Sequence, residues 1–233
     1  ATSIIETDGL TLADSELSGQ LDLTTGGAIV LNNLNAGTNS VNLAAGGSIS
    51  DGNDDTTVTN NVTAGTLTIT GDQTVVGIET TVTTLDLTTA ATSIIEVDGL
   101  TLADSELSGQ LDLTTGGAIV LNNLNAGTNA VNVSAGGDIS DGNDDTAGNN
   151  VTAGTLTISG DQAVTGIETA VSTLDLATGA TSIIETDGLT LADSELSGQL
   201  DLTTGGAVVL NTLTASEQTV NLVSVSYTHL TLP

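Results

Sequence analysis

The sequence predicts an all-β fold, a parallel β-helix (β-solenoid) of about ten coils of 18–26 residues. Three observations lead to this prediction. The chain repeats itself with a period of about 90 residues, and a shorter rhythm of apolar triplets runs inside that period. The repeats contain no aromatic side chain, so their core must be built from small and aliphatic residues.

The long repeat divides the 233-residue chain into similar units. The segment that opens at Ala1 recurs at Ala91, with Val97 in place of Thr7, and recurs again at Ala180. We therefore expect one solenoid repeat over 1–90, a second over 91–179 and a partial third over 180–224. The second unit is one residue shorter because the loop after its DGNDD sequence has lost a residue. Such a deletion indicates an exposed loop.

Triplets with the pattern apolar–polar–apolar set the shorter rhythm. They start 18–26 residues apart, and we interpret each interval as one coil, with four coils in each long repeat. The first residues of the triplets, which we expect to stack on one another, are Leu21, Val41, Leu67, Leu85, Leu111, Val131, Leu156, Leu174, Leu200 and Val220.

A second apolar strand follows each triplet after a sharp corner. Ile29 lies six residues beyond Leu23, and Gly26 and Gly27 fill the bend between them. Glycine adopts the backbone angles of a tight corner at low cost. Each coil is therefore expected to contain at least two strands that pair with the coils before and after it.

Tandem antiparallel β-sandwiches are the alternative architecture. A unit of about 90 residues has the size of one immunoglobulin-like domain. Such domains usually fill the space between their sheets with large aromatic side chains, which these repeats lack. The direction of strand pairing distinguishes the two folds, since a solenoid pairs its strands in parallel.

The charge of the chain restricts its partners. It has no Lys or Arg and 29 acidic residues, for a formal net charge of −29. Without cations it cannot neutralise phosphates, so we expect no nucleic-acid partner and no attraction to anionic membrane surfaces. No run of 18 or more apolar residues is present, so we expect no membrane insertion in this segment. Disorder is also disfavoured, because 38% of the residues are hydrophobic and many alternate with polar ones. Attraction to cations, Ca²⁺ above all, remains.

The repeats lack the residues of most catalytic sites, so we expect a protein that is not an enzyme and has no catalytic residues. They contain neither His nor Cys, which excludes the usual nucleophile–base pairs. Carboxylates spaced as in a glycosidase are present, but they recur three times along the chain and are better interpreted as a charged outer face. This set is Glu6, Asp8, Asp14, Glu16; Glu96, Asp98, Asp104, Glu106; and Glu185, Asp187, Asp193, Glu195.

The DGNDD sequences are candidate Ca²⁺ sites. Oxygen side chains stand at alternate positions, as at the start of a calcium-binding loop, in Asp51, Asn53, Asp55 and in Asp141, Asn143, Asp145. The EF-hand pattern then fails, because Thr56 replaces the glycine and Val62 replaces the bidentate glutamate. A solvated acidic turn is the other interpretation of the same residues.

The middle residues of the triplets supply further Ca²⁺ candidates. If successive triplets stack, they form an outward ladder that places Asp86 beside Asp112 and Asp175 beside Asp201. Neighbouring carboxylates repel unless a cation or a raised pKa relieves them. We therefore predict weak cation binding at these two pairs, with screened surface repulsion as the alternative.

The last nine residues, 225–233, differ from the rest of the chain. They contain its only Tyr, His and Pro. The string VSYTHLTLP resembles a translated sequencing adapter, so this segment is expected to be a non-native tail and is excluded from the fold prediction.

Two stretches of the first repeat carry a family resemblance. SVNLAAGGSISDGND and NVTAGTLTITGDQTVVGIET resemble the repeats of filamentous-haemagglutinin-like adhesins and of β-strand-repeat exoproteins from environmental bacteria. The resemblance extends over 1–224 and implies a right-handed parallel β-helix at the bacterial cell surface. It also implies a stalk or adhesive role, with a glycan or protein ligand bound by other parts of the parent protein. A calcium-stabilised matrix or surface-layer protein is the alternative function.

Overall fold

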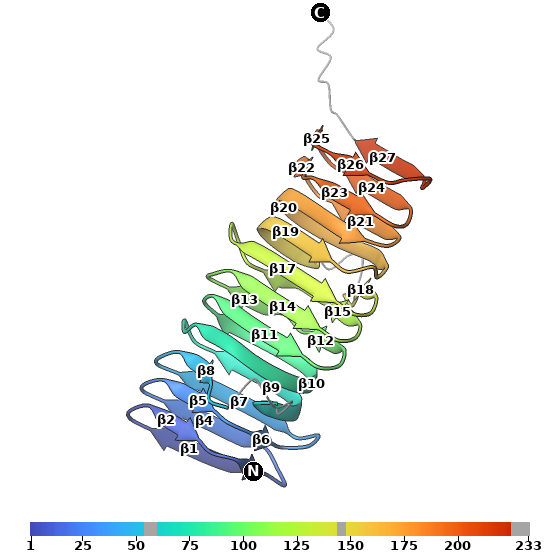
Figure 1. The fold of residues 1–233 in the computed structure, drawn as a ribbon. Helices are drawn as coiled ribbons and strands as arrows, with labels where there is room; N and C mark the ends of the chain where they lie inside the picture. Colours follow the sequence, from blue (N-terminus) through green and yellow to red (C-terminus); the bar gives the residue numbers. More distant parts are fainter. Residues whose placement is uncertain (54–59, 144–147, 225–233) are drawn as a thin grey trace, which may run out of the picture.

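The protein is a parallel β-solenoid of about 11 turns (Figure 1). The computed structural model describes residues 1–53, 60–143 and 148–224. Every regular element in these ranges is a β-strand, and every strand pair is parallel. The predicted β-helix is therefore confirmed and the antiparallel sandwich alternative is wrong. The expected non-native tail lies outside the described residues.

The strands follow one another along the chain as follows. In the first repeat they are β1 (Thr2–Glu6), β2 (Leu10–Leu12), β3 (Ser15–Glu16), β4 (Leu21–Thr25), β5 (Ile29–Leu31), β6 (Leu34–Asn35), β7 (Ser40–Ala45), β8 (Ile49–Asp51), β9 (Val62–Thr70) and β10 (Val75–Thr89). In the second they are β11 (Thr92–Glu96), β12 (Leu100–Leu102), β13 (Ser105–Leu107), β14 (Leu111–Thr115), β15 (Ile119–Leu121), β16 (Leu124–Asn125), β17 (Ala130–Ala135), β18 (Ile139–Asp141), β19 (Val151–Ser159) and β20 (Val164–Thr178). In the third they are β21 (Thr181–Glu185), β22 (Leu189–Leu191), β23 (Ser194–Leu196), β24 (Leu200–Thr204), β25 (Val208–Leu210), β26 (Leu213–Thr214) and β27 (Val220–Ser224).

Most coils are built from three strands separated by corners. In the first turn, β1 stacks on β4, β2 on β5 and β3 on β6. The alternation of apolar and polar residues explains these strands, because successive side chains point into and out of the coil. In β14, for example, Leu111, Leu113 and Thr115 are buried, while Asp112 and Thr114 are exposed.

A column of stacked residues, aliphatic except for Thr92, runs through the solenoid and forms much of its core. Each member lies opposite the next in adjacent coils, at the usual strand spacing of ~4.8 Å. From Ile29 to Leu191 every member is at most 2% exposed. The column comprises Leu10, Ile29, Ile49, Val75, Thr92, Leu111, Val131, Leu156, Leu174, Leu191 and Leu210.

The predicted stacking of triplets is confirmed within a repeat but wrong between repeats. Leu21, Val41, Leu67 and Leu85 lie opposite one another in that order. Leu85, however, faces Leu102 on the next coil, whereas Leu111 faces Thr92. The reason is that the 26 residues from Leu85 to Leu111 are more than one coil: the triplet that starts at Leu100 lies between them and supplies the strand that stacks on β10.

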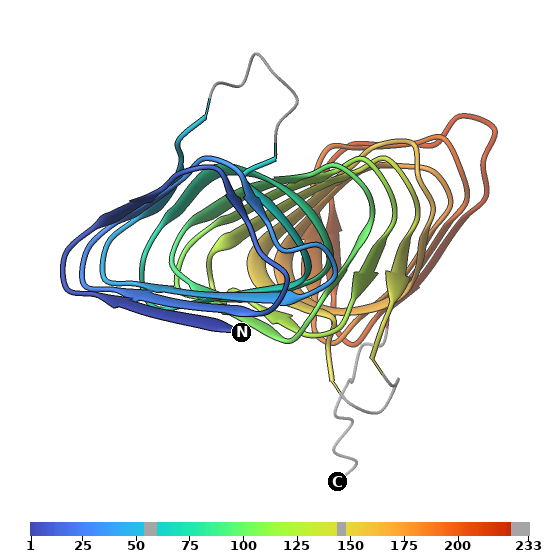
Figure 2. The same cartoon turned by 90° about the horizontal axis from the view of Figure 1, so that it is seen from below.

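The long repeat is therefore not a whole number of coils. Leu21 of the first repeat and its sequence equivalent Leu111 belong to different columns, because Leu111 continues the column that begins at Leu10. Equivalent residues of successive repeats thus face different sides of the solenoid. Figure 2 shows the solenoid from below, with neighbouring coils overlapping and displaced step by step from the first repeat (blue) to the third (orange and red).

Glycines let the coils approach closely at one corner. A Cβ atom on Gly26 would collide with the backbone carbonyl of Thr7, and one on Gly46 would collide with that of Gly26. Both obstacles are backbone atoms, which cannot move aside as a flexible side chain could. The predicted glycine corner therefore exists, but Gly26 and Gly46 do not have a positive φ, so glycine is required there for close approach between coils and not for the backbone angles that the sequence suggested.

Candidate functional site: acidic turns, buried carboxylates and grooves

The DGNDD turns satisfy one of their acidic oxygens with N–H donors. Asp51 Oδ1 accepts hydrogen bonds from Asn53 N at 2.8 Å and from Asn61 Nδ2 at 2.7 Å. In the second repeat, Asp141 Oδ1 accepts equivalent bonds from Asn143 N at 2.8 Å and from Asn150 Nδ2 at 2.8 Å. Of the six Ca²⁺ candidates in these turns, Asp55 and Asp145 lie outside the described residues.

Two asparagines inside the solenoid were not predicted from the sequence. Asn61 and Asn150 are both 0% exposed. Asn61 Nδ2 also donates to the carbonyl oxygens of Leu31 at 2.9 Å and Asn32 at 3.1 Å, and its Oδ1 accepts from Glu79 N at 2.7 Å. One side chain thus connects backbone groups of consecutive coils. The sequence Asn60-Asn61 does not by itself show which of the two amides points inward.

Amides replace cations along the outward ladder. Asp22 Oδ1 accepts hydrogen bonds from Asn42 Nδ2, one coil away, at 2.5 Å and from Gln20 Nε2 at 2.8 Å. These bonds, that from Asn42 first, hold the pKa of Asp22 below its usual value. The same arrangement of a Gln and an Asn recurs around Asp112 and Asp201.

The expected carboxylate pairs are not adjacent. Asp112 lies opposite Ser93 on the preceding coil, and Asp201 lies opposite Ser182. The prediction that placed Asp86 beside Asp112, and Asp175 beside Asp201, was therefore wrong, for the same reason as the triplet stacking between repeats. Burial raises the pKa of Asp86, and the charge of Asp104 adds to the effect.

Two glutamates that we expected on a charged outer face are inside instead. Glu96 and Glu185 are each 1% exposed. The alternation within TSIIE could have indicated this position, because an inward Ile94 requires Glu96 to point inward as well. Their exposed relatives in the same sets, Glu106 and Glu195, lie on the surface as expected.

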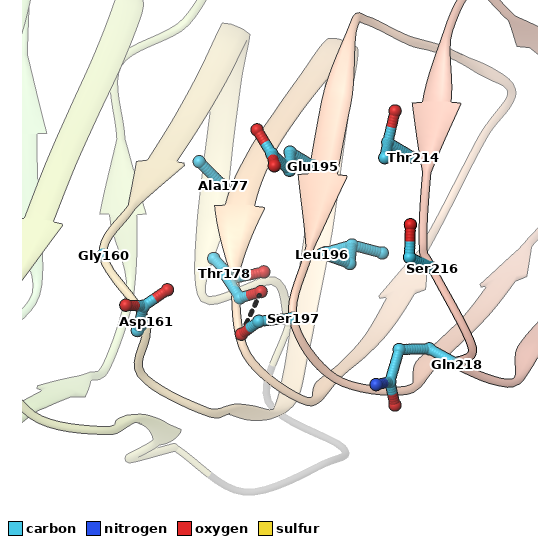
Figure 3. Close-up of a pocket in the computed structure, with 10 residues that line it drawn as sticks. All are labelled: Gly160, Asp161, Ala177, Thr178, Glu195, Leu196, Ser197, Thr214, Ser216 and Gln218. Atoms are coloured by element: carbon cyan, nitrogen blue, oxygen red, sulfur yellow. Dashed lines mark hydrogen bonds between the residues drawn. The ribbon is translucent and has the colours of Figure 1, made fainter.

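Shallow polar grooves recur on the surface. Figure 3 shows a cavity of about 530 Å³ lined by Gly160, Asp161, Ala177, Thr178, Glu195, Leu196, Ser197, Thr214, Ser216 and Gln218. Ser197 Oγ donates to the carbonyl oxygen of Thr178 at 3.5 Å within it. The equivalent groove one repeat earlier, about 290 Å³, includes Asp72 and Glu106. Carboxylates and hydroxyls can hold polar groups or cations, but no nucleophile–base pair is formed by these lining residues.

The described residues contain neither a cluster of metal ligands nor a membrane-spanning helix. Over 1–53, 60–143 and 148–224, no three His, Cys, Asp or Glu side chains gather closely enough to hold a metal ion. Nor do these ranges contain a helix that is long and apolar enough to span a membrane.

Comparison with protein-family models, with curated proteins and with solved structures finds no match. The resemblance to filamentous-haemagglutinin-like adhesins therefore remains a prediction from the repeat sequences.

Proposed function

We propose that residues 1–224 form an acidic, extended stalk within a large exported bacterial surface protein of the filamentous-haemagglutinin-like kind. The stalk displays or spaces a region of the parent protein that binds a glycan or protein ligand. The observation that carries this proposal is the continuous column from Leu10 to Leu210, aliphatic except for Thr92, which runs through all the repeats.

The geometry of the rod suits a spacer. About 11 turns at ~4.8 Å per strand layer give a length of roughly 50 Å. Each further coil would add the same increment, so length is set by repeat number. The net charge of −29 makes neighbouring rods repel, which favours separate stalks over lateral association.

A display experiment tests the stalk function. A small domain of known ligand would be fused beyond one or two copies of residues 1–224 on the surface of a bacterium with a thick polysaccharide coat. We expect capture of ligand-coated beads to increase with copy number, and to exceed that of a Gly/Ser linker with the same number of residues. Capture that is no better than with the linker would refute the spacer role, as would strong binding of the solenoid itself to glycans or matrix proteins.

The calcium-stabilised matrix or surface-layer role is the second candidate, and the acidic turns at Asp51 and Asp141 favour it. It predicts that the melting temperature rises with millimolar Ca²⁺ but not with the same concentration of Mg²⁺. The stalk proposal expects no such difference, because amide donors already satisfy one oxygen of each of these carboxylates. Asp51→Asn with Asp141→Asn is the control, since a Ca²⁺ effect at the turns would disappear in this pair.

A further inference from the structure

The side chain of Glu96 connects two consecutive repeats. It lies at the end of β11, the first strand of the second repeat, and is buried against β10, the last strand of the first. Its Oε2 accepts hydrogen bonds from Thr80 Oγ1 at 2.7 Å and from Val82 N at 3.0 Å. Its Oε1 accepts a bond from Asp98 N at 3.2 Å, within its own turn. The carboxylate therefore binds a hydroxyl and a backbone amide of the preceding repeat.

The same arrangement occurs at the next junction. Glu185 ends β21 and accepts hydrogen bonds from Thr169 Oγ1 at 2.8 Å, from Val171 N at 3.1 Å and from Asp187 N at 3.1 Å. Two independent junctions thus carry one geometry, built from equivalent residues.

Glu6 shows how much of the burial and hydrogen bonding of Glu96 depends on the preceding repeat. It has the same local sequence, but no strand of the described residues precedes β1 to cover it. It is only half-buried, and its Oε1 accepts bonds from Thr7 N at 2.9 Å and Asp8 N at 3.2 Å in its own turn. The cross-coil bonds and the burial therefore belong to the junction between repeats, and the TSIIE sequence alone does not produce them.

No Lys or Arg exists in the chain to neutralise these buried carboxylates. Burial raises the pKa of Glu96 above its usual value, the bonds from Thr80, Asp98 and Val82 oppose that shift, and the charge of Asp98 adds to it. Burial likewise raises the pKa of Glu185, with the charge of Asp187 adding to the shift. The other acidic residues on the strands packed against these two are Glu79, Asp86 and Asp112, and Glu168, Asp175 and Asp201.

We propose that Glu96 and Glu185 are acid-sensitive clasps, which join each repeat to the preceding one and hold it more firmly as the pH falls. When protonated, the carboxyl group no longer suffers the loss of hydration that a buried charge does, and it can donate its proton to the threonine hydroxyl. This inference depends on the solenoid fold alone and not on the stalk function.

The direction in which stability changes with pH follows from the raised pKa of Glu96 and Glu185. Below the unfolded-state pKa of about 4.5, the folded and unfolded chains are both protonated and the full stabilisation is present. As the pH rises through the folded-state pKa, the folded chain loses a proton that it held more tightly than the unfolded chain, and this stabilisation is lost. Each junction is therefore firmest in mild acid.

Paired variants test the clasp. Melting temperature would be measured between pH 7.5 and 4.5 for the parent, for Glu96→Gln with Glu185→Gln, and for Glu106→Gln with Glu195→Gln. The last pair removes the same charge from exposed positions of the same repeats. We expect the gain in melting temperature on acidification to be smaller by roughly 2–4 °C in the buried pair than in the exposed pair. Equal gains in the two pairs would overturn the proposal.

A direct titration covers the case in which the buried variants fail to fold. Carboxyl-carbon NMR of the parent would compare the titration midpoints of Glu96 and Glu185 with that of Glu6. Midpoints above that of Glu6 support the clasp, and midpoints at or below it overturn it. Thr80→Val should raise the Glu96 midpoint further because it removes a donor to the carboxylate, while Thr80→Ser, which keeps the hydroxyl, should leave it near the parent value.

Discussion

At the scale of single residues, the structure shows how a protein without basic side chains satisfies its carboxylates. Amides of Asn and Gln bind Asp22 and its equivalents on the surface, and Thr hydroxyls with backbone amides bind Glu96 inside. Each of these donors is neutral, so acidic residues do not need cations as neighbours. Asn61 is a further neutral group of this kind, because its buried amide forms hydrogen bonds with backbone groups on consecutive coils.

Replacing Asn61 by Ala is expected to lower the free energy of unfolding by about 2–4 kcal/mol. The change removes the side-chain hydrogen bonds that link Asn61 to Leu31, Asn32, Asp51 and Glu79, and a typical hydrogen bond contributes about 0.5–1.5 kcal/mol. The Leu31 carbonyl keeps its bond from Gly52 N at 2.7 Å. Urea unfolding followed by circular dichroism measures the loss. Asn35→Ala is the matched control, because Asn35 is exposed and its side chain caps only the N–H of Gly37, at 3.0 Å. Equal losses in the two variants would contradict this account of Asn61.

At the scale of strands and coils, the sequence was sufficient for the fold class but not for the full register. Parallel stacking followed from triplets such as Leu21 to Leu23, because an alternating strand that recurs every 18–26 residues can bury its apolar face only against its own copies. The register between repeats did not follow. The triplet at Leu100 had the same pattern, but a spacing of 26 was already assigned to one coil.

The candidate site was less accessible to sequence reasoning than the fold. Whether an acidic side chain is buried depends on which residues of the neighbouring coil lie opposite, and this register was the uncertain part. An error of one strand at the boundary placed Asp86 beside Asp112, and the same reasoning did not place Glu96 inside. The Asn partners of Asp22 and Asp112 lie 20 residues away, so they too become visible only once the coils are aligned.

Substituting Gly46 by Ala tests the close approach of coils at the glycine corner. The added Cβ would meet the backbone carbonyl of Gly26, so the two coils must separate locally. We expect a loss of about 1–3 kcal/mol in the free energy of unfolding, as for other overpacked sites. Gly37→Ala is the comparison: its φ is +59° but a Cβ there meets no atom within 4 Å, so only about 1 kcal/mol of backbone strain is expected. A smaller loss at Gly46 than at Gly37 would refute the close-approach argument.

At the scale of the whole molecule, repulsion between the carboxylates opposes the stacking of the coils. The chain carries a formal charge of −29 along a rod of about 11 turns, and hydrophobic stacking holds the coils together against that repulsion. Dissolved cations are the screening charges available to such a chain, since it has no Lys or Arg of its own.

Salt is therefore expected to stabilise the solenoid. Raising NaCl from 0.01 M to 0.5 M shortens the screening length from about 30 Å to less than 8 Å, which weakens repulsion between carboxylates on neighbouring coils. We expect the melting temperature to rise by several degrees, with most of the rise below 0.15 M. The exposed pair Glu106→Gln with Glu195→Gln should show a smaller rise. A melting temperature that falls with added NaCl would contradict the dominance of repulsion.

The mismatch between the 90-residue repeat and the coil has a consequence for how such a protein can grow. A duplicated unit does not return to the side of the rod from which it started, because Leu111 continues a different column from Leu21. Duplication still joins smoothly, since the column that begins at Leu10 continues through strands of all three repeats. Gene duplications would therefore arrange copies of one surface helically around the axis of the rod. A partner that approaches from any direction would then meet one of the copies.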